Sequence, residues 1–218
     1  MTALVRWLGL SDYQQTWQSM REFTDERDED TVDEIWLLEH RPVYTLGLAG
    51  KREHIIGPPG DIPVVQSDRG GQITYHGPGQ LVAYLLLDLK RLSMGAKALV
   101  HATEAAVIDA LNVVSLIGAR REGAPGVYVD SAKIAALGFR IRRGCCYHGV
   151  AINIDVDLAP YARINPCGYA GMPVTSLSKL GVDMTTFEFG QVLLAGLQRQ
   201  LPLSIASAPA SFVTKTGT

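Results

Sequence analysis

The sequence predicts an α+β fold, a mixed or antiparallel sheet with helices packed on it, in a single domain covering residues 1–218. Short apolar runs bounded by glycine and proline bunch together along the chain, as the strands of one sheet do. The longer segments with helical spacing lie between these groups and do not alternate with every strand. No internal repeat or linker divides the 218 residues, and 47% of them are hydrophobic, which is enough for a sizeable core.

Three long helices and a short one are predicted. Either Ser11 or Asp12 is a suitable N-cap for the first helix, which runs to about Glu26. The segment 94–114 has apolar residues on one helical face and is expected to cover the sheet. Beyond the helices, the small-residue segment 204–218 is expected to be a poorly ordered tail. The later helices are expected at 158–163 and 185–201.

The strand candidates are short apolar runs. Residues 35–38 are apolar throughout, which indicates a buried strand that ends before Pro42. Two hairpins are expected in the second half of the chain, one turning at Asp130 between 126–129 and 131–136, the other joining 139–143 to 146–153. The remaining strands are predicted at 44–47, 62–66 and 81–89.

Composition excludes several classes of protein. The formal net charge is −2, whereas a nucleic-acid-binding protein needs a clustered excess of lysine and arginine. No apolar run reaches the roughly 18 residues of a membrane span, and residues 1–8 lack the layout of a secretory signal. Three cysteines make a poor disulfide framework. We therefore expect a cytoplasmic monomer with reduced thiols and with neither a nucleic-acid nor a membrane partner.

Two clusters of charge stand out against this balance. The acidic run 25–34 is interpreted as a solvated helix end and loop. The basic cluster has two interpretations, since its arginines either steer an acidic partner at long range or are ordinary solvated strand ends. Its members are Arg120, Arg121, Arg140, Arg142 and Arg143.

The strongest functional signal is the segment 69–80, RGGQITYHGPGQ. Its glycines leave backbone amides open to a ligand, while Arg69 supplies a fixed charge and His76 a titratable donor. A glycine-rich hairpin between two core strands is the structural alternative. A binding segment is favoured because a purely structural turn has little use for so many different polar side chains. The segment is neither a Walker motif nor a Rossmann fingerprint.

This segment, followed by LVAYLLLDL, resembles the signature of the lipoyl(octanoyl) transferases, the octanoyl-[acyl-carrier-protein]:protein N-octanoyltransferases related to lipoate and biotin protein ligases. Three further segments match that family in the same order, and together the four span about residues 33–180. Four ordered motifs are far more specific than one glycine loop. The resemblance implies the catalytic fold of the biotin and lipoate ligases. The further segments are 39–47 (EHRPVYTLG), 133–138 (KIAALG) and 165–177 (NPCGYAGMPVTSL).

Cys167 is the candidate nucleophile. Proline and glycine on either side place it in a loop, whereas Cys145 and Cys146 lie in a strand-like run and keep a structural interpretation. A thiol with the ordinary pKa of about 8.5 is mostly protonated near pH 7, so a nucleophilic cysteine needs a nearby cation or base.

Lys133, His76 and His148 are the candidates for that partner. From the residues alone, Lys133 is interpreted as part of the exposed face of an edge strand. The family instead pairs its active-site cysteine with a lysine in a motif of this type. The resemblance therefore implies that Lys133 stabilises the Cys167 thiolate and carries a proton during acyl transfer. His148 is as readily a structural histidine as a donor near the substrate.

The reaction that the resemblance implies is a two-step acyl transfer through a cysteine thioester. The donor would be octanoyl-acyl carrier protein, whose acyl group is carried on 4′-phosphopantetheine. The acceptors would be lysines of the lipoyl domains of 2-oxoacid dehydrogenase E2 subunits and of the glycine-cleavage H protein. No cofactor is expected: ATP is unnecessary because amide formation from a thioester is downhill. No metal is expected either, because the five histidines show no zinc spacing.

The resemblance also implies three walls of a substrate site. An eight-carbon chain needs an apolar slot, and backbone amides near Cys167 are candidate oxyanion donors. The first wall comprises Arg69, Gly70, Gly71, Gln72, Ile73, Thr74, Tyr75 and His76, the second Ala136, Leu137 and Gly138, and the third Gly149, Val150 and Ala151.

Two other functions remain as alternatives. An ATP-dependent lipoate or biotin protein ligase on the same scaffold would form an acyl-adenylate and would have no need for Cys167. A non-catalytic module would bind acyl groups or lipoyl domains without turnover. The pairing of Lys133 with Cys167 argues against both.

Overall fold

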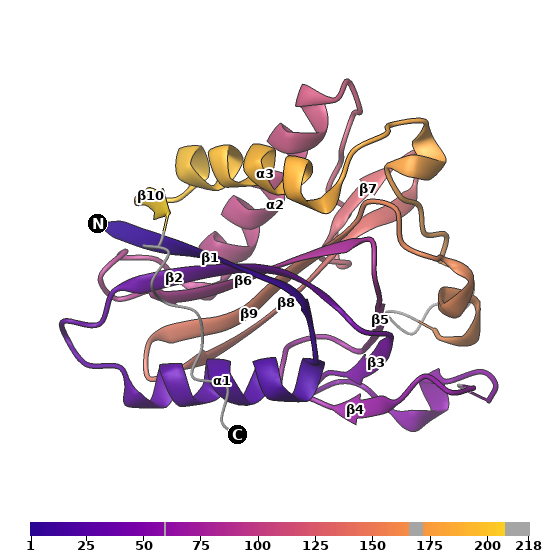
Figure 1. Ribbon diagram of the computed structural model, residues 1–218, viewed down its shortest axis with the longest axis horizontal. Coiled ribbons are helices and arrows are strands. Elements are labelled where there is room, and N and C mark those ends of the chain that lie inside the picture. Colours follow the sequence, from indigo (N-terminus) through magenta and orange to yellow (C-terminus); the bar gives the residue numbers. More distant parts are fainter. Residues whose placement is uncertain (59, 166–171, 208–218) are drawn as a thin grey trace.

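The computed structural model describes residues 1–58, 60–165 and 172–207. Over these ranges, seven strands form one mixed sheet and three others form a small second sheet. Helices α2 (Ala96–Val113) and α3 (Thr186–Gln200) lie on one face of the large sheet, and α1 (Tyr13–Glu26) lies on the other (Figure 1). The predicted α+β class, with helices packed on a mixed sheet, is confirmed.

The large sheet has the strand order β10-β1-β2-β6-β9-β8-β7. Strand β1 pairs in parallel with both β10 and β2, whereas the pairs from β2 through β7 are antiparallel. The strands are β1 (Thr2–Ser11), β2 (Asp33–His40), β6 (Gln80–Asp88), β7 (Val127–Val129), β8 (Ala132–Arg142), β9 (Cys145–Asn153) and β10 (Ser204–Ser207).

The small sheet has the order β4-β3-β5 and lies beyond the first turn of α1 (Figure 1). Tyr13 at the start of that helix packs against Val43 and Val65 of the small sheet. No helix in the described part of the chain has the length and apolar content needed to cross a membrane. The strands are β3 (Val43–Leu46), β4 (Val64–Gln66) and β5 (Ile73–His76), and the short 3-10 helices are η1 (Arg52–His54), η2 (Ala159–Arg163) and η4 (Ser178–Leu180).

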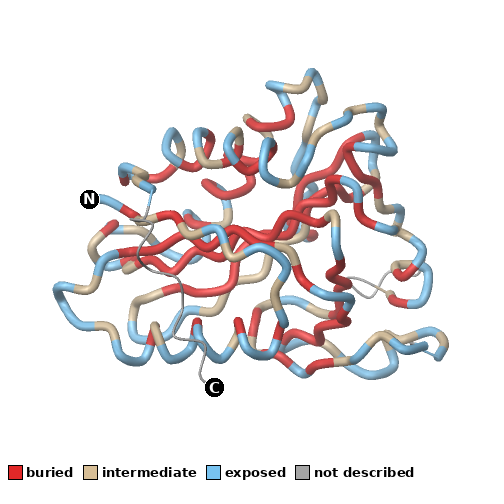
Figure 2. The backbone as a smooth tube through the Cα atoms, in the orientation of Figure 1, coloured by how far each residue is buried: buried red, intermediate tan, exposed pale blue. Residues whose placement is uncertain are grey.

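The core has one apolar layer on each face of the large sheet. Leu85 and Leu87 of β6 point toward α2 and α3, while Tyr84 and Leu86 point toward α1, because successive side chains of a strand alternate between faces. Figure 2 shows the strands of this sheet mostly buried and the outer sides of the helices exposed. The central strands are therefore held rigidly from both sides.

Three segments differ from the sequence-based expectations. Strand β1 was not predicted, because only Ala3 and Val5 in it are fully buried and the alternation is too short to stand out. Residues 204–207, expected to belong to a disordered tail, form β10 because β1 offers them backbone partners. The two strands expected at 131–136 and 139–143 are one continuous strand, β8, which pairs with β9 along most of its length.

The acidic run ends inside the sheet, which corrects its interpretation as a solvated segment. Asp33 begins β2 and is buried. Its Oδ1 accepts hydrogen bonds from Arg27 and, at 2.8 Å, from Arg91 Nη2. The next residue, Glu34, forms an ion pair with Arg6. Two arginines on one buried carboxylate compensate for the loss of its hydration.

Several arginines of the basic cluster form ion pairs within the chain. Arg142 and Arg143 contact Asp25 at 2.8 and 3.1 Å, and Arg120 contacts Glu104 at 3.1 Å. Nearby carboxylates reduce the long-range field of these charges. This arrangement favours the interpretation of the cluster as ordinary strand-end charges.

We expect Asp33→Asn to lower the free energy of unfolding by about 3 kcal/mol, because it leaves the buried Arg27 and its neighbour Arg91 without a carboxylate. Asp25→Asn is the matched control, since its partners are exposed and its loss should cost less than about 1 kcal/mol. Urea unfolding followed by circular dichroism measures both. Equal losses in the two variants would contradict the role assigned to Asp33.

Candidate functional site

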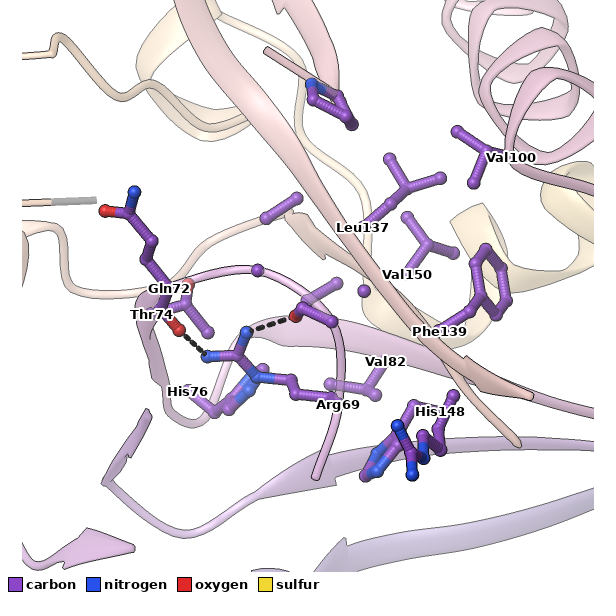
Figure 3. A pocket seen from close by; sticks show the side chains of 18 of the residues that line it. Arg69, Gln72, Thr74, His76, Val82, Val100, Leu137, Phe139, His148 and Val150 are labelled. Carbon is purple, nitrogen blue, oxygen red and sulfur yellow. Dashed lines mark hydrogen bonds between the residues drawn. The ribbon is translucent and has the colours of Figure 1, made fainter. Parts of the chain in front are cut away.

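A cavity of about 420 Å³ lies where the glycine segment meets β8 and β9. All of the predicted substrate-site residues except Tyr75 line it, and so does Lys133. In Figure 3, the polar side chains of Arg69 and His148 lie on one side of the cavity, and Val100 and Leu137 lie on the other. The fold thus brings together three segments that are far apart in the sequence.

The cavity floor consists of small residues in register. Ala136 of β8 lies opposite Ala151 of β9, and Gly138 lies opposite Gly149, which in turn pairs with Tyr84 of β6. Residues two apart on a strand share a face, so these pairs form successive layers of one surface. Side chains of this size leave the backbone of the sheet accessible from the cavity.

The glycine segment closes over this floor. Gly70 N donates a hydrogen bond to Phe139 O at 3.0 Å. A Cβ atom on Gly138 would lie only 2.6 Å from Gly70 O, so this crossing requires glycine. Residues 73–76 of the segment, expected to be loop, form β5 and pair antiparallel with β3. The segment is therefore a turn followed by a strand.

Tyr75 is the predicted substrate-site residue that does not line the cavity. Along β5, Thr74 and His76 line the cavity wall, and strand alternation directs Tyr75 elsewhere. Its ring packs against Tyr44 and Tyr161, with centroid separations of 5.6 and 5.7 Å. Tyr75 thus belongs to the apolar core of the small sheet.

Arg69 holds the glycine turn from inside. Its guanidinium donates hydrogen bonds to Gly70 O at 2.9 Å and to Gln72 O at 2.8 Å (Figure 3). It also donates to Thr45 Oγ1 at 3.0 Å. A fourth bond goes to the carbonyl of Thr45. These contacts tie the turn to β3, so the predicted fixed charge is built into the cavity wall.

Lys133 is buried at one end of the cavity and does not lie on an exposed strand face. Its Nζ donates to Pro125 O at 3.2 Å and lies 5.2 Å from the ring centroid of Tyr128. Its backbone N donates to Pro173 O at 2.8 Å, and its carbonyl accepts from Thr175 N at 3.0 Å. The segment that follows the cysteine motif is therefore bonded directly to this lysine.

The candidate nucleophile, Cys167, lies outside the described residues, so its pairing with Lys133 stays a prediction. The other two cysteines occupy strand β9. Cys146 is fully buried, its Sγ donates to Leu85 O at 3.2 Å, and burial raises the pKa of its thiol to about 12. Burial also raises the pKa of the half-buried Cys145. Both environments disfavour a thiolate.

A polar cluster around Asp68, missed by the sequence analysis, lies at the other end of the cavity. Asp68 accepts hydrogen bonds from Trp17 Nε1 at 2.7 Å, from His148 Nε2 at 2.9 Å and from the hydroxyl of Tyr147. Burial opposes ionisation of the Asp68 carboxyl, but the bonds from His148 and Tyr147 outweigh it and lower the pKa. The available sequence signal was the position of Asp68 beside Arg69.

His148 reaches Asp68 through an unusual backbone conformation. Consecutive strand residues normally point to opposite faces, yet Tyr147 and His148 bind the same carboxylate. The φ angle of 61° at His148, in the left-handed region, turns its ring to the same side, where it stacks on Tyr147 with a centroid separation of 5.0 Å. Strain of this kind is concentrated at functional sites.

Three buried histidines surround this polar end. His40 Nε2 lies 2.6 Å from the hydroxyl of Tyr84, and His76 Nδ1 lies 2.7 Å from Gln80 Oε1. Burial lowers the pKa of His40 to about 4 and that of His76 well below its ordinary value. Burial also lowers the pKa of His148, despite the carboxylate beside it. All three are therefore neutral at pH 7. Within the described ranges, no group of three or more His, Cys, Asp or Glu residues is placed to hold a metal ion.

Comparison with known proteins finds similarity in both sequence and fold. A family model described as the lipoyl protein ligase A/B catalytic domain matches residues 12–198. An octanoyltransferase of Azoarcus sp. (strain BH72) is 57% identical over 199 residues, which cover 91% of this chain and 88% of that protein.

Two solved structures illustrate the shared fold. Lipoate-protein ligase A bound with ATP has a TM-score of 0.80 at 14% identity, over 96% of this chain and 90% of that one. Biotin protein ligase from Aquifex aeolicus has a TM-score of 0.55 at 12% identity, over 92% of this chain and 69% of that one. The predicted likeness to the biotin and lipoate ligase catalytic fold is confirmed.

We expect the free energy of unfolding to fall as the pH drops from about 6.5 to about 4. The three buried histidines have lowered pKa values in the folded protein, so the unfolded chain binds more protons than the folded one in this pH range. Their contribution to the free energy of unfolding is fully present above pH 6.5. It is lost as the pH approaches the pKa values of the histidines in the folded protein. For His40 it is on the order of 3 kcal/mol.

Urea unfolding at a series of pH values measures this effect, and His40→Gln should make the pH dependence shallower by about one proton. A stability that stays level between pH 7 and pH 4.5 would show that the histidines are not held neutral by the fold.

Proposed function

This chain belongs to the lipoyl protein ligase A/B catalytic-domain family, as an octanoyltransferase of protein lipoylation, and we propose that it moves the octanoyl group from octanoyl-acyl carrier protein to a lysine of apo lipoyl domains. The acceptors in this proposal are the lipoyl domains of 2-oxoacid dehydrogenase E2 subunits and the glycine-cleavage H protein. A cytoplasmic location and a monomeric state are also parts of the proposal.

The position of Lys133 is the observation that carries this proposal. The lysine is buried at one end of a cavity whose floor is apolar. Its backbone is hydrogen-bonded to the segment that begins five residues after Cys167. An acyl chain lying on Ala136 and Ala151 would extend from this end of the cavity. Each CH₂ group removed from water contributes about 0.8 kcal/mol to binding.

The proposed chemistry has two steps. Cys167 attacks the thioester carbon of the donor, the bond from that carbon to the carrier sulfur breaks, and Lys133 gives a proton to the departing thiolate. The ε-amine of the acceptor lysine then attacks the octanoyl-cysteine thioester. Lys133 takes a proton from that amine as the amide forms, and the cysteine thiolate leaves. Protons and charges balance without ATP or a metal.

Buried Lys133 suits both roles. As an ammonium it favours the thiolate of its proposed partner, and as a buried amine it exchanges a proton in a site from which bulk water is largely excluded. The Tyr128 ring and the Pro125 carbonyl hold its Nζ in place. A lysine fixed in this way loses little conformational entropy when the acyl-enzyme forms.

Incubation with octanoyl-acyl carrier protein, without ATP, should add one octanoyl group to the parent protein and none to Cys167→Ser. Intact-protein mass spectrometry detects the adduct. An adduct on both proteins would remove Cys167 from the mechanism, and an adduct that requires ATP would instead support a ligase-type reaction.

Replacing the lysine by Lys133→Met should lower octanoyl transfer by about 10²–10⁴-fold, because it removes both the cation and the proton carrier. Lys179→Met, which changes an exposed lysine in η4, is the matched control and should retain parent activity. Transfer of octanoyl to a purified lipoyl domain is the readout, with the unfolding midpoint measured in parallel. Near-parent activity in a folded Lys133→Met protein would refute the assigned role.

A further inference from the structure

The turn just before β7 holds the side chain of Lys133. The Nζ atom of this lysine donates a hydrogen bond to Pro125 O at 3.2 Å. A Cβ atom on Gly126, whose φ angle is 143°, would lie 3.3 Å from Lys133 Nζ and only 2.7 Å from Ala135 O, so this close approach requires glycine. The turn therefore lies directly against the amine, and a group that fixes the turn also fixes the lysine.

A buried carboxylate holds this turn from the other side. Glu104 lies in α2, which packs against β7 and β8, and it is 5% exposed. Its Oε1 accepts a hydrogen bond from Gly126 N at 2.9 Å. Its Oε2 accepts one from Arg120 Nε at 3.1 Å, which compensates for part of the hydration that burial removes. Helix α2 thus places a negative charge behind the turn that faces the lysine.

The two hydrogen bonds meet on one peptide group. Pro125 O and Gly126 N belong to the same planar amide, so Glu104 binds its N–H. Lys133 binds the C=O of that amide. A hydrogen bond to a charged group is roughly twice as strong as a neutral one, and hydrogen bonds in series polarise one another by about 10–30% per bond. A carboxylate on the N–H therefore makes the carbonyl a better acceptor for the lysine ammonium.

The bond to Pro125 O sets the direction of the other N–H groups of Lys133. An ammonium carries three N–H donors, and holding one of them on Pro125 O fixes the directions in which the other two point. When the lysine has given up a proton, one N–H stays on Pro125 O and the lone pair takes one of those two directions. The same bond thus orients the lysine in both protonation states of the proposed reaction.

A purely structural role does not account for a carboxylate at this position. A backbone N–H in a buried turn needs an acceptor, but a neutral side chain or a carbonyl supplies one without the cost of burying a charge. Here the buried charge of Glu104 is aimed at a peptide group that also binds the candidate proton carrier. The position of the charge indicates that it acts on the lysine.

We propose that Glu104 is a positioning residue for Lys133, acting through the peptide group that joins Pro125 to Gly126. Glu104 is not among the residues that line the cavity, so it acts on the lysine and not on the substrate. It strengthens and aims the hydrogen bond that orients the amine. This inference rests on the proposed transferase function, because the orientation of Lys133 matters only if the lysine moves a proton.

The first test measures octanoyl transfer to a purified lipoyl domain. Glu104→Gln retains an oxygen that accepts from Gly126 N but removes the charge, so we expect kcat to fall about fivefold with the KM for octanoyl-acyl carrier protein unchanged. Asp109→Asn is the matched control and should keep the parent kcat, since it neutralises another carboxylate of α2, one that binds Arg199 and Gln200. An unchanged kcat in a folded Glu104→Gln protein would overturn the proposal.

A double-mutant cycle separates positioning from a general effect on the fold. The quantity measured is the single-turnover rate of acyl-enzyme formation, followed by intact-protein mass spectrometry, which also suits slow variants. In a Lys133→Met protein, Glu104→Gln should cause no further loss, because no amine is left to orient. The same fold-loss in both backgrounds would show that Glu104 does not act through Lys133, and the proposal would be wrong.

A second variant covers the case in which Glu104→Gln does not fold because Arg120 has lost its partner. Combining Glu104→Gln with Arg120→Gln removes both charges, and this protein is compared with Arg120→Gln alone. A loss of about fivefold in kcat supports the proposal, and equal kcat values overturn it.

If the parent protein forms no acyl-enzyme, the transferase proposal fails first. The NMR signals of the Lys133 Cε methylene, assigned by their loss in Lys133→Met, then test the positioning role without turnover. They should move toward those of a flexible lysine in Glu104→Gln and stay in place in Asp109→Asn. Signals that stay in place in both variants would overturn the role of Glu104.

Discussion

The backbone hydrogen bonds between Lys133 and the segment around Val174 are the constraint on which the site depends. Strand β9 ends its pairing with β8 at Ala135, and the later segment takes over beside the lysine. Strand β8 is thereby bonded to three separate parts of the chain. These are β9, the segment around Val174 and, on its other side, β7. A lysine on such a strand cannot shift without breaking sheet contacts, among them its backbone hydrogen bonds to Pro173 and Thr175.

The cavity combines two surfaces with opposite requirements. Its floor is nearly bare backbone, because Ala136 and Gly138 leave room above the sheet. Its far end is a network centred on the Asp68 carboxylate, which joins α1, the glycine segment and β9. The apolar floor supplies affinity in proportion to area, whereas a buried polar network supplies selectivity through the cost of leaving it unpaired. Burial keeps the nearby histidines neutral, so the charges near this end are that carboxylate and the guanidinium groups of Arg69 and Arg140.

Local patterns made most of the fold predictable, and all but one of the residues predicted for the three walls line a single cavity. The helices follow from spacing and from caps such as Asp12, whose side chain accepts from Gln15 N. The polar end was not predictable, because Asp68 and His148 are 80 residues apart and meet only through the sheet, and a left-handed φ leaves no trace in composition. Tyr75 lies outside this cavity because residues 73–76, expected to be loop, form a strand in which side chains alternate between faces.

Strands β1 and β10 are the first and last that the structure describes. They lie nearly the whole sequence apart, yet they pair side by side in the sheet. During synthesis, β1 can join β2 early, but its outer edge waits for residues 204–207 to emerge. An open strand edge invites pairing with other chains. The register shift between Trp7 and Gly9 distorts strand β1 and so makes this edge less regular. The irregular edge therefore reduces the risk of self-association in the nascent chain before residues 204–207 emerge.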